Sequence, residues 1–160
     1  MDLEYLKSIL HYDPITGIWT WLKDNYSVKS GDIAGSFNHG YCRIQIDEKK
    51  YGSHVLAWFY MTGEWPENLV DHINTNTRDN RWINLRKATS KQNQGNSNKR
   101  KDNSTGFKGV SFHKASGKFV AQITINEKRV YLGIRTTPEE AFELYKQSAI
   151  EYFGDYCRLA

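Results

Sequence analysis

The residues best suited to chemistry in this chain lie between positions 70 and 96. An Asp-His pair, Asp71 and His72, is followed by two asparagines, Asn84 and Asn93, in a stretch short enough to fold as one unit. A carboxylate, an imidazole and two amides can together hold one hard metal ion and one activated water. Those are the groups that hydrolysis of a phosphodiester needs.

Two short strands and a helix are predicted to position these side chains. The expected order is a strand, a turn-rich loop, a returning strand and a helix, at residues 68–73, 74–80, 82–88 and from Thr89 onward. Thr89 and Gln92 form a capping box at the start of the helix, so Asn93 lies in its first turns, close to the hairpin end that carries the Asp-His pair. Asn80 and Arg81 are interpreted as loop residues.

This pattern resembles the HNH endonucleases of the ββα-metal type. The resemblance is to the His-Asn-Asn subclass found in phage and intron-encoded homing endonucleases. It rests on Asp71-His72, on Asn84-Leu85-Arg86 and on Gln92-Asn93. The upstream segments YDPITGIWTW (12–21) and SHVLAWFYMTGEWP (53–66) also resemble the leader of these proteins.

The resemblance implies a role for each of the four residues. Asp71 and Asn93 would ligate one divalent ion, Mg²⁺ or Mn²⁺, because an incomplete shell of oxygen ligands suits those ions. His72 would be the general base that deprotonates the attacking water. Asn84 would either orient His72 or brace the loop. The commoner family form has histidine where this chain has Asn93, so we expect a modest metal affinity.

The positive charge of the chain is concentrated in one segment. The net charge is +4, yet residues 98–135 hold 9 basic and 2 acidic side chains. A localised basic zone is typical of a protein that binds a polyanion. The polar linker at 98–106 contains the run Lys99-Arg100-Lys101, which either lies on a solvated surface or follows a phosphate backbone.

Three runs with alternating polar and apolar residues follow the linker. They predict strands at residues 107–113, 118–125 and 129–134, with a helix that starts at a Thr137 capping box. The apolar face is predicted to contain Val110, Phe112, Phe119, Ala121, Ile123, Ile125, Val130, Leu132 and Ile134. The expected structure is a three-stranded antiparallel sheet packed on one helix, with the other sheet face polar and cationic.

Residues 106–154 resemble the APETALA/ERF domain of plant ethylene-response factors. The matching letters include K-G-V, Y-L-G and the helix T-P-E-E-A-x-x-x-Y. In that family the sheet lies in the major groove. Carried over by position, the residues that would face DNA are Lys108, Ser111, His113, Lys118, Gln122, Thr124, Arg129 and Tyr131. Family positions that are usually Arg or Trp are Ser111, Thr124 and Tyr131 here, which favours phosphate contact over reading of a defined base sequence.

Together these patterns predict an α+β protein with two modules. The domains are expected at residues 1–97 (HNH nuclease with an N-terminal helix and hairpin extension, core about 68–97), 98–106 (basic linker) and 107–160 (ERF-type domain). The expected activity is a site-directed, homing-type nickase acting on double-stranded DNA as a monomer, without an organic cofactor, and leaving a 5′ phosphate and a 3′ hydroxyl. The alternatives are a catalytically inactive DNA-binding regulator and an RNA-binding module. No apolar run is long enough to span a bilayer, so a cytoplasmic place in a bacterial or phage-infected cell is expected.

Overall fold

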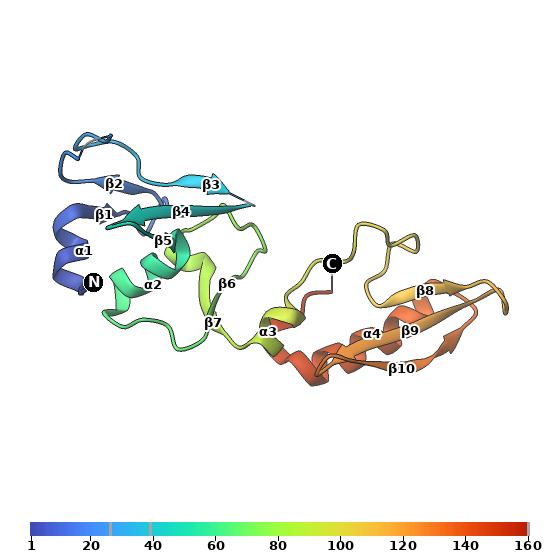
Figure 1. Ribbon diagram of the computed structural model, residues 1–160. Helices are drawn as coiled ribbons and strands as arrows, with labels where there is room; N and C mark the ends of the chain where they lie inside the picture. Colours follow the sequence, from blue (N-terminus) through green and yellow to red (C-terminus); the bar gives the residue numbers. More distant parts are fainter. Residues whose placement is uncertain (26, 39, 160) are drawn as a thin grey trace. The chain divides into compact units, whose positions relative to one another are not determined.

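The computed structural model of the chain describes residues 1–25, 27–38 and 40–159 (Figure 1). Helices and short antiparallel sheets make up the structure, which confirms the predicted mixture of helices with antiparallel strands. The residues group into two compact units, Met1–Ala88 and Thr89–Ala160.

The first unit begins with a helix and a small hairpin. Helix α1 (Leu3–Ile9) starts at Asp2, whose side chain accepts a backbone N–H of the first turn at 2.8 Å. The helix ends at Ile9 because the next residues are extended and form strand β1 (Leu10–Tyr12). Strand β1 pairs antiparallel with β2 (Trp19–Trp21). This hairpin places the intervening turn beside the residues of the candidate site.

A three-stranded sheet and a second helix follow. The hairpin of β4 (Tyr41–Ile46) and β5 (Lys49–Gly52) was predicted, and the sheet order is β3-β4-β5. Strand β3 (Ser36–Asn38) was not predicted, because its three residues are all exposed and show no apolar alternation. Helix α2 (Ser53–Thr62) continues directly from β5 and ends at Gly63, which has a left-handed backbone with φ of 78°.

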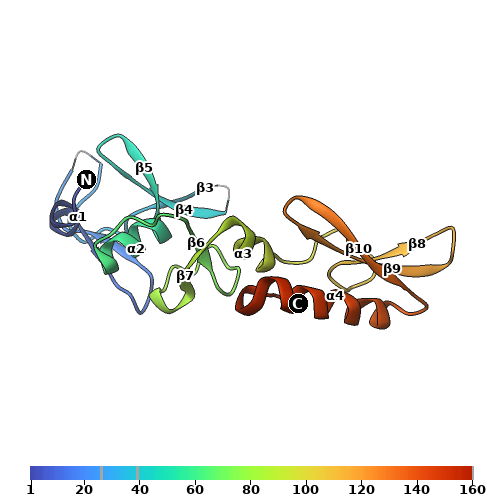
Figure 2. The same ribbon diagram turned by 90° about the horizontal axis from the view of Figure 1, so that it is seen from below.

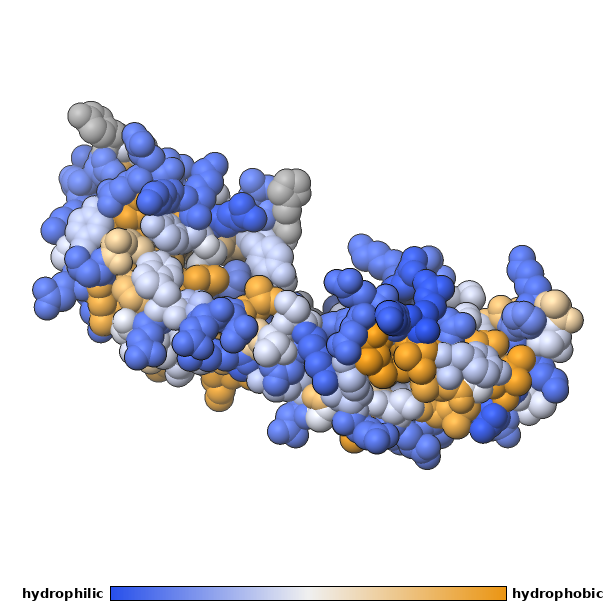
Figure 3. All heavy atoms as spheres, turned by 60° about the horizontal axis from the view of Figure 1, so that its bottom comes forward, coloured by the Kyte–Doolittle hydropathy of each residue, from blue (hydrophilic) through white to orange (hydrophobic). Residues whose placement is uncertain are grey.

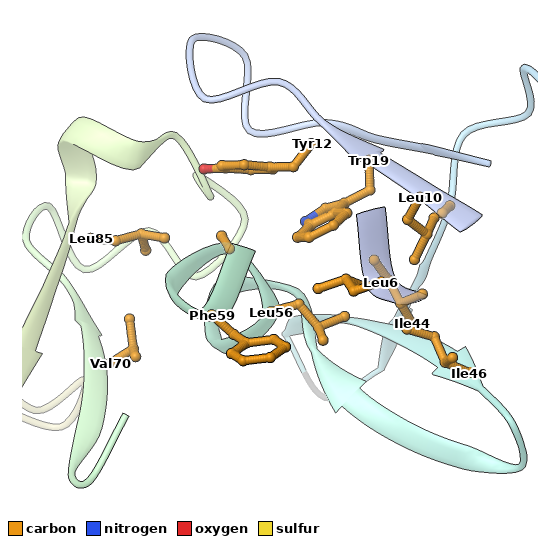
Figure 4. Close-up of a cluster of buried hydrophobic side chains, with 12 residues drawn as sticks. Leu6, Leu10, Tyr12, Trp19, Ile44, Ile46, Leu56, Phe59, Val70 and Leu85 are labelled. Atoms are coloured by element: carbon orange, nitrogen blue, oxygen red, sulfur yellow. The ribbon is translucent and has the colours of Figure 1, made fainter. Parts of the chain in front are cut away.

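The hydrophobic core of the first unit lies between α1, α2 and the neighbouring strands (Figure 4). Each element contributes one apolar face to this core. The fully buried members are mostly large side chains. They include Leu6, Leu10, Tyr12, Trp19, Ile44 and Leu56. The Tyr12 and Trp19 rings pack with centroids 4.9 Å apart. Tyr12 thus carries a buried hydroxyl out of this core toward the candidate site.

The last elements of the first unit form a two-stranded sheet. Strand β6 (Leu69–His72) pairs antiparallel with β7 (Leu85–Ala88). The returning strand starts later than predicted, because a 3₁₀ turn, η1 (Trp82–Asn84), precedes it. In that turn the Asn84 N–H donates to the Arg81 carbonyl oxygen at 2.9 Å, a contact that an extended strand would not allow.

The second unit contains a short helix, a three-stranded sheet and a long helix. The elements are α3 (Ser90–Gly95), β8 (Val110–His113), β9 (Lys118–Ile125), β10 (Lys128–Arg135), α4 (Pro138–Phe153) and η2 (Gly154–Tyr156). The sheet order is β10-β9-β8, and α4 lies along one face (Figure 2). The predicted capping boxes at Thr89 and Thr137 are both present. Ala141, Tyr145 and Ala149 point from α4 into the core.

A register shift in β10 changes one prediction about the sheet. The shift falls between Tyr131 and Gly133, so Ile134 pairs with Val120 rather than following the predicted alternation. Ile134 therefore lies on the polar face, opposite the predicted side. At Gly133 an added Cβ would lie 2.9 Å from Leu144 of α4, so the bulge puts a residue without a side chain at the close approach of sheet and helix.

The boundary between the two compact units lies between Ala88 and Thr89, just before α3. A Cβ added at Gly95 would lie 2.6 Å from the Phe153 ring, and Arg158 N donates to the Gly95 carbonyl oxygen at 3.2 Å. These contacts pack α3 with the second unit. The assignment of a nuclease domain to 1–97 and a DNA-binding domain to 107–160 stays a prediction.

Both units leave some apolar side chains at the surface (Figure 3). The most exposed are Ile15 and Ile83, at 80% and 82%. Within the described part of the chain, no helix combines the length and the apolar character that a membrane crossing requires.

Candidate active site and DNA-binding surface

The Asp-His pair lies at the end of strand β6, and both side chains are buried. Asp71 is directly opposite Arg86 of β7, and its Oδ2 accepts a hydrogen bond from the Arg86 Nε at 3.0 Å. Asp71 and His72 are 7% and 3% exposed. Sequence reasoning gave Arg86 no role, although the antiparallel pairing of the two predicted strands could have placed it beside Asp71. The ion pair fixes the carboxylate at the edge of the site.

A buried asparagine fixes the ring of His72. The Nε2 of His72 lies 3.0 Å from Oδ1 of Asn80, and Asn80 is only 4% exposed. Because an amide oxygen can only accept, the ring must donate from Nε2, and this tautomer carries its lone pair on Nδ1. Asn80, interpreted from the sequence as a loop residue, is thus a direct partner of the histidine.

Asn84 makes a different set of contacts, all within the loop that joins β6 to β7. Its Oδ1 accepts from the Asn74 N–H at 3.0 Å. Its Nδ2 donates to Asn74 Oδ1 at 3.0 Å and to the Asp79 carbonyl oxygen at 2.7 Å. Of the two roles that the sequence left open for Asn84, these contacts correspond to bracing the loop.

The same loop contains a tight ion pair. Asp79 accepts from Arg81 Nε at 2.7 Å and from Nη2 at 2.6 Å, and it also accepts from Asn74 Nδ2 at 2.8 Å. The hydrogen bond from Arg81 is the main reason that the pKa of Asp79 falls to about 2. The carboxylate therefore stays charged at neutral pH and holds the loop in one conformation.

Two aromatic side chains border His72. The His54 ring at the start of α2 lies with its centroid 5.0 Å from that of His72, and the Tyr41 ring of β4 lies at 6.2 Å. Burial, helped by the positive charge that His72 can carry, lowers the pKa of His54 to about 4. His54 is therefore a neutral neighbour at physiological pH. From the sequence, His54 was interpreted as a structural residue at the start of a helix, with phosphate contact as the alternative. Its position beside His72 was not predicted, because nothing local links residue 54 to residue 72.

Asn93 lies in the first turns of α3, as predicted, and its side chain is exposed. Thr89 and Gln92 cap this helix through bonds of 3.2 and 2.8 Å. Asn93 belongs to the second unit and Asp71 to the first, so their pairing as metal ligands stays a prediction. Among the described residues, no group of three or more His, Cys, Asp and Glu side chains is gathered as a metal site.

Several residues predicted to face DNA come together on the polar sheet face of the second unit. His113 is opposite Lys118, Gln122 is opposite Tyr131, and Thr124 is opposite Arg129. Residues paired across strands point to the same side of a sheet, so these six share one face. Ser111 joins them through its pairing with Val120. The face contains the two cations Lys118 and Arg129, with the His113 imidazole opposite Lys118.

The basic segment after α3 borders the same face. A groove of about 340 Å³ is lined by Lys99 and Arg100 together with Gln122, Thr124 and Arg129 of the sheet. The Lys99 Nζ donates to the Gly106 carbonyl oxygen at 3.0 Å, and Arg100 pairs with Asp102 at 3.1 Å. Lys101 is exposed beside them. The segment and the sheet thus contribute positive charge to one hollow.

Lys108 differs from the other predicted DNA-facing residues. Its Nζ donates to the carbonyl oxygens of Gly95, Ser97 and Arg158, at 3.0, 2.6 and 3.0 Å. Burial lowers its pKa from the usual value. The ammonium group has three N–H bonds, and these carbonyls use them all. The expectation of an outward-facing Lys108 is therefore corrected: its amine links the end of α3 to the C-terminal segment within the second unit.

Comparison with known proteins identifies one part of the chain. Residues 51–94 match the model of a family described as HNH endonuclease, and this range contains all four residues singled out for chemistry. No curated protein and no solved structure matches the chain. HNH nucleases generally use a divalent metal ion and act on DNA. With an HNH endonuclease match that covers the buried Asp-His pair and its loop, the chain is a nuclease, a phosphodiester hydrolase.

Proposed function

We propose that this protein is a metal-dependent, homing-type endonuclease that nicks double-stranded DNA and leaves a 5′ phosphate and a 3′ hydroxyl. The observation that carries the proposal is the buried His72, held in one tautomer by Asn80 within the matched range. A base with a fixed lone pair is what the activation of a water requires. One such centre per chain acts on one strand at a time, which favours a nick by a monomer.

His72 is the general base in this proposal. Its Nδ1 takes a proton from the attacking water, whose oxygen then bonds to phosphorus while the bond between phosphorus and the 3′ oxygen breaks. The departing 3′ oxygen takes a proton from solvent and becomes the 3′ hydroxyl. The Nε2–H stays on Asn80 Oδ1 at 3.0 Å, which stabilises the ring when it becomes charged. Asn84 acts indirectly, because its bonds to Asn74 and Asp79 fix the loop that carries Asn80.

Asp71 and Asn93 are the residues proposed to hold the divalent ion. Both offer oxygen donors, which suits Mg²⁺ or Mn²⁺ better than softer metals. Once bound, such an ion supplies charge stabilisation at the phosphate and at the leaving oxygen. Arg86 keeps the Asp71 carboxylate oriented through Oδ2. With only one protein carboxylate in the set, we expect weak metal binding that DNA phosphates strengthen.

The second unit is proposed to hold the duplex in the manner of the ERF-type domain that it resembles. The proposed DNA-facing residues are Lys99, Arg100, Lys101, Ser111, His113, Lys118, Gln122, Thr124, Arg129 and Tyr131, without Lys108. The groove that joins the basic segment to the sheet supports this set, because cations from two segments line it. Phosphate contacts of this kind give affinity and register rather than sequence choice.

A regulator that binds DNA without cutting it is the second candidate. The observation that favours it is the Arg86 guanidinium on Asp71, because a metal ion would have to share the carboxylate with a fixed positive charge. A protein in which that ion pair blocks metal binding would keep the DNA-binding surface and lose catalysis.

One experiment separates the two candidates. Supercoiled plasmid is incubated with the protein and Mg²⁺ or Mn²⁺, with and without a chelator, and DNA binding is followed in parallel by gel shift. The nuclease proposal predicts open-circular DNA only when metal is present. Binding with no nick under either metal would support the regulator.

A further inference from the structure

Asn80 contacts both the N-terminal hairpin and the candidate base, His72. Its side-chain Oδ1 contacts His72 Nε2 at 3.0 Å, and its backbone carbonyl oxygen accepts from the Tyr12 hydroxyl at 2.6 Å. All three residues are at most 4% exposed. Figure 4 shows the Tyr12 hydroxyl pointing away from the neighbouring Trp19 ring. Burial raises the pKa of this hydroxyl, so it remains a donor.

The turn after Tyr12 holds the same stretch of backbone. Trp82 N donates to the Pro14 carbonyl oxygen at 3.0 Å. A Cβ added at Gly17 would lie 2.5 Å from the carbonyl carbon of Asn80, and the φ of Gly17 is +74°. Only glycine allows this approach. Residues 12–17 therefore clamp the backbone from which the Asn80 side chain reaches His72.

From these contacts we infer that Asn80 is the positioning residue of the His72 base and that Tyr12 holds Asn80 in place. The inference rests on the proposed role of His72. Asn80 makes no contact with substrate in this account; it selects the Nε2–H tautomer and the ring orientation. Through Tyr12, the N-terminal hairpin would then help to position the base as well as contribute to the hydrophobic core.

The physical reason is the burial of the whole chain of contacts. A buried Nε2–H that loses its acceptor has no water to replace it, so the ring is driven toward the other tautomer or another rotamer. Either change moves the lone pair away from Nδ1. Polar or charged groups packed near His72 include Asp71 on the same strand, Arg86 opposite Asp71 on β7, His54 on α2 and Tyr41 on β4. The contact at Nε2 itself is with Oδ1 of Asn80, at 3.0 Å.

The test combines a spectroscopic and a kinetic measurement on the full-length protein. Nitrogen-15 NMR of the His72 ring reports the tautomer without DNA or metal, and plasmid nicking gives kcat and KM. The variants are Asn80→Ala, Asn80→Asp, which keeps an acceptor oxygen, and Tyr12→Phe, which removes only the anchoring hydroxyl. Asn76→Ala in the same loop and Tyr60→Phe in the same aromatic cluster are the matched controls, since the Asn76 side chain accepts from the Arg78 N–H and the Tyr60 ring packs on the Tyr12 ring.

We expect Asn80→Ala to abolish the Nε2–H preference and to lower kcat by about 10–100-fold, with KM changed by less than about twofold. Asn80→Asp should recover the tautomer and most of kcat, and Tyr12→Phe should show a smaller change in the same direction. The inference is overturned if Asn80→Ala keeps the wild-type tautomer, or if the tautomer changes while kcat stays at the wild-type value.

Failure of the proposed function gives a different result. If His72→Ala nicks plasmid as the wild type does, His72 is not the base and the catalytic role of Asn80 falls with it. The NMR measurement would still decide whether Asn80 sets the His72 tautomer. A variant that unfolds is recognised from its amide spectrum, and Asn80→Asp and Tyr12→Phe, which change fewer atoms, then decide the question.

Discussion

The loop between β6 and β7 and the polar face of the β10-β9-β8 sheet are both rich in polar side chains, yet they are organised in opposite ways. Asn80 and Asn84 of the loop, and His72 at the end of β6 where the loop begins, are buried and hydrogen-bonded at about 3 Å. On the sheet, Ser111, His113, Lys118, Arg129 and Tyr131 are exposed. The comparison indicates that the first region fixes single atoms for chemistry, whereas the second offers charge to a long polymer.

The sharpest test of this difference removes the base. His72→Ala should lower the nicking rate by at least about 10²–10⁴-fold, the contribution typical of a general base. DNA affinity, measured by gel shift in the presence of Ca²⁺, should remain within about twofold of the wild type, because the sheet face is untouched. A large loss of affinity would mean that His72 also contributes to DNA binding, which contradicts the separation of catalysis from binding.

Lys108 belongs to the second unit but resembles the residues of the loop, because its charged amine is held by backbone carbonyls instead of facing solvent. Lys108→Met should lower the free energy of unfolding by about 1–3 kcal/mol, since three carbonyl groups lose a charged donor. Lys101→Met, at an exposed position nearby, is the control and should leave thermal unfolding unchanged. If Lys101→Met destabilises the protein as much as Lys108→Met, the internal role of Lys108 is wrong.

Arg129 should show the behaviour of the binding face. Arg129→Ala removes one cation from the groove, so DNA affinity should fall by several-fold and the slope of log affinity against log salt should decrease by about one. The kcat of nicking should not change at saturating DNA. Lys146→Ala, on the exposed side of α4, serves as the control for a general loss of positive charge. A change in kcat without a change in salt slope would contradict the assignment.

A smaller effect concerns the pH dependence of folding. The pKa of His54 is lowered from 6.5 to about 4, so between those values the unfolded chain binds more protons than the folded protein. Stability is therefore complete above about pH 6.5 and declines as the pH falls toward 4. His54→Gln should flatten this decline in urea unfolding curves, whereas His11→Gln at an exposed site should not. An unchanged slope in His54→Gln would show that another group causes the decline.

Local sequence patterns were sufficient for much of the scaffold. Both capping boxes, the β6 strand with its Asp-His pair and the three strands of the second unit follow from spacing within a few residues. The register shift at Gly133 was not predictable, because it depends on the close approach of Leu144, which lies on a different element. Ile134 was consequently assigned to the wrong face.

The missed contacts of the site are long-range or depend on an irregular loop. Asn80 lies eight residues after His72 across a loop without periodicity, and Tyr12 lies 68 positions away from its acceptor. Lys108 was assigned to the surface because the sequence reveals its charge but not the three backbone carbonyls, from two separate segments, that surround its amine. A residue's partners, more than its type, decided its role in each case.

The most direct test of the central claim is the chemistry of the cut. Plasmid nicked by the wild-type protein in Mg²⁺ is treated with DNA ligase, and the ends are mapped on both strands of a defined substrate. We expect a nick in one strand that ligase seals, because the ends are a 5′ phosphate and a 3′ hydroxyl, and no nick with chelator or with His72→Ala. A product that ligase cannot seal, or the same nick from His72→Ala, would contradict it.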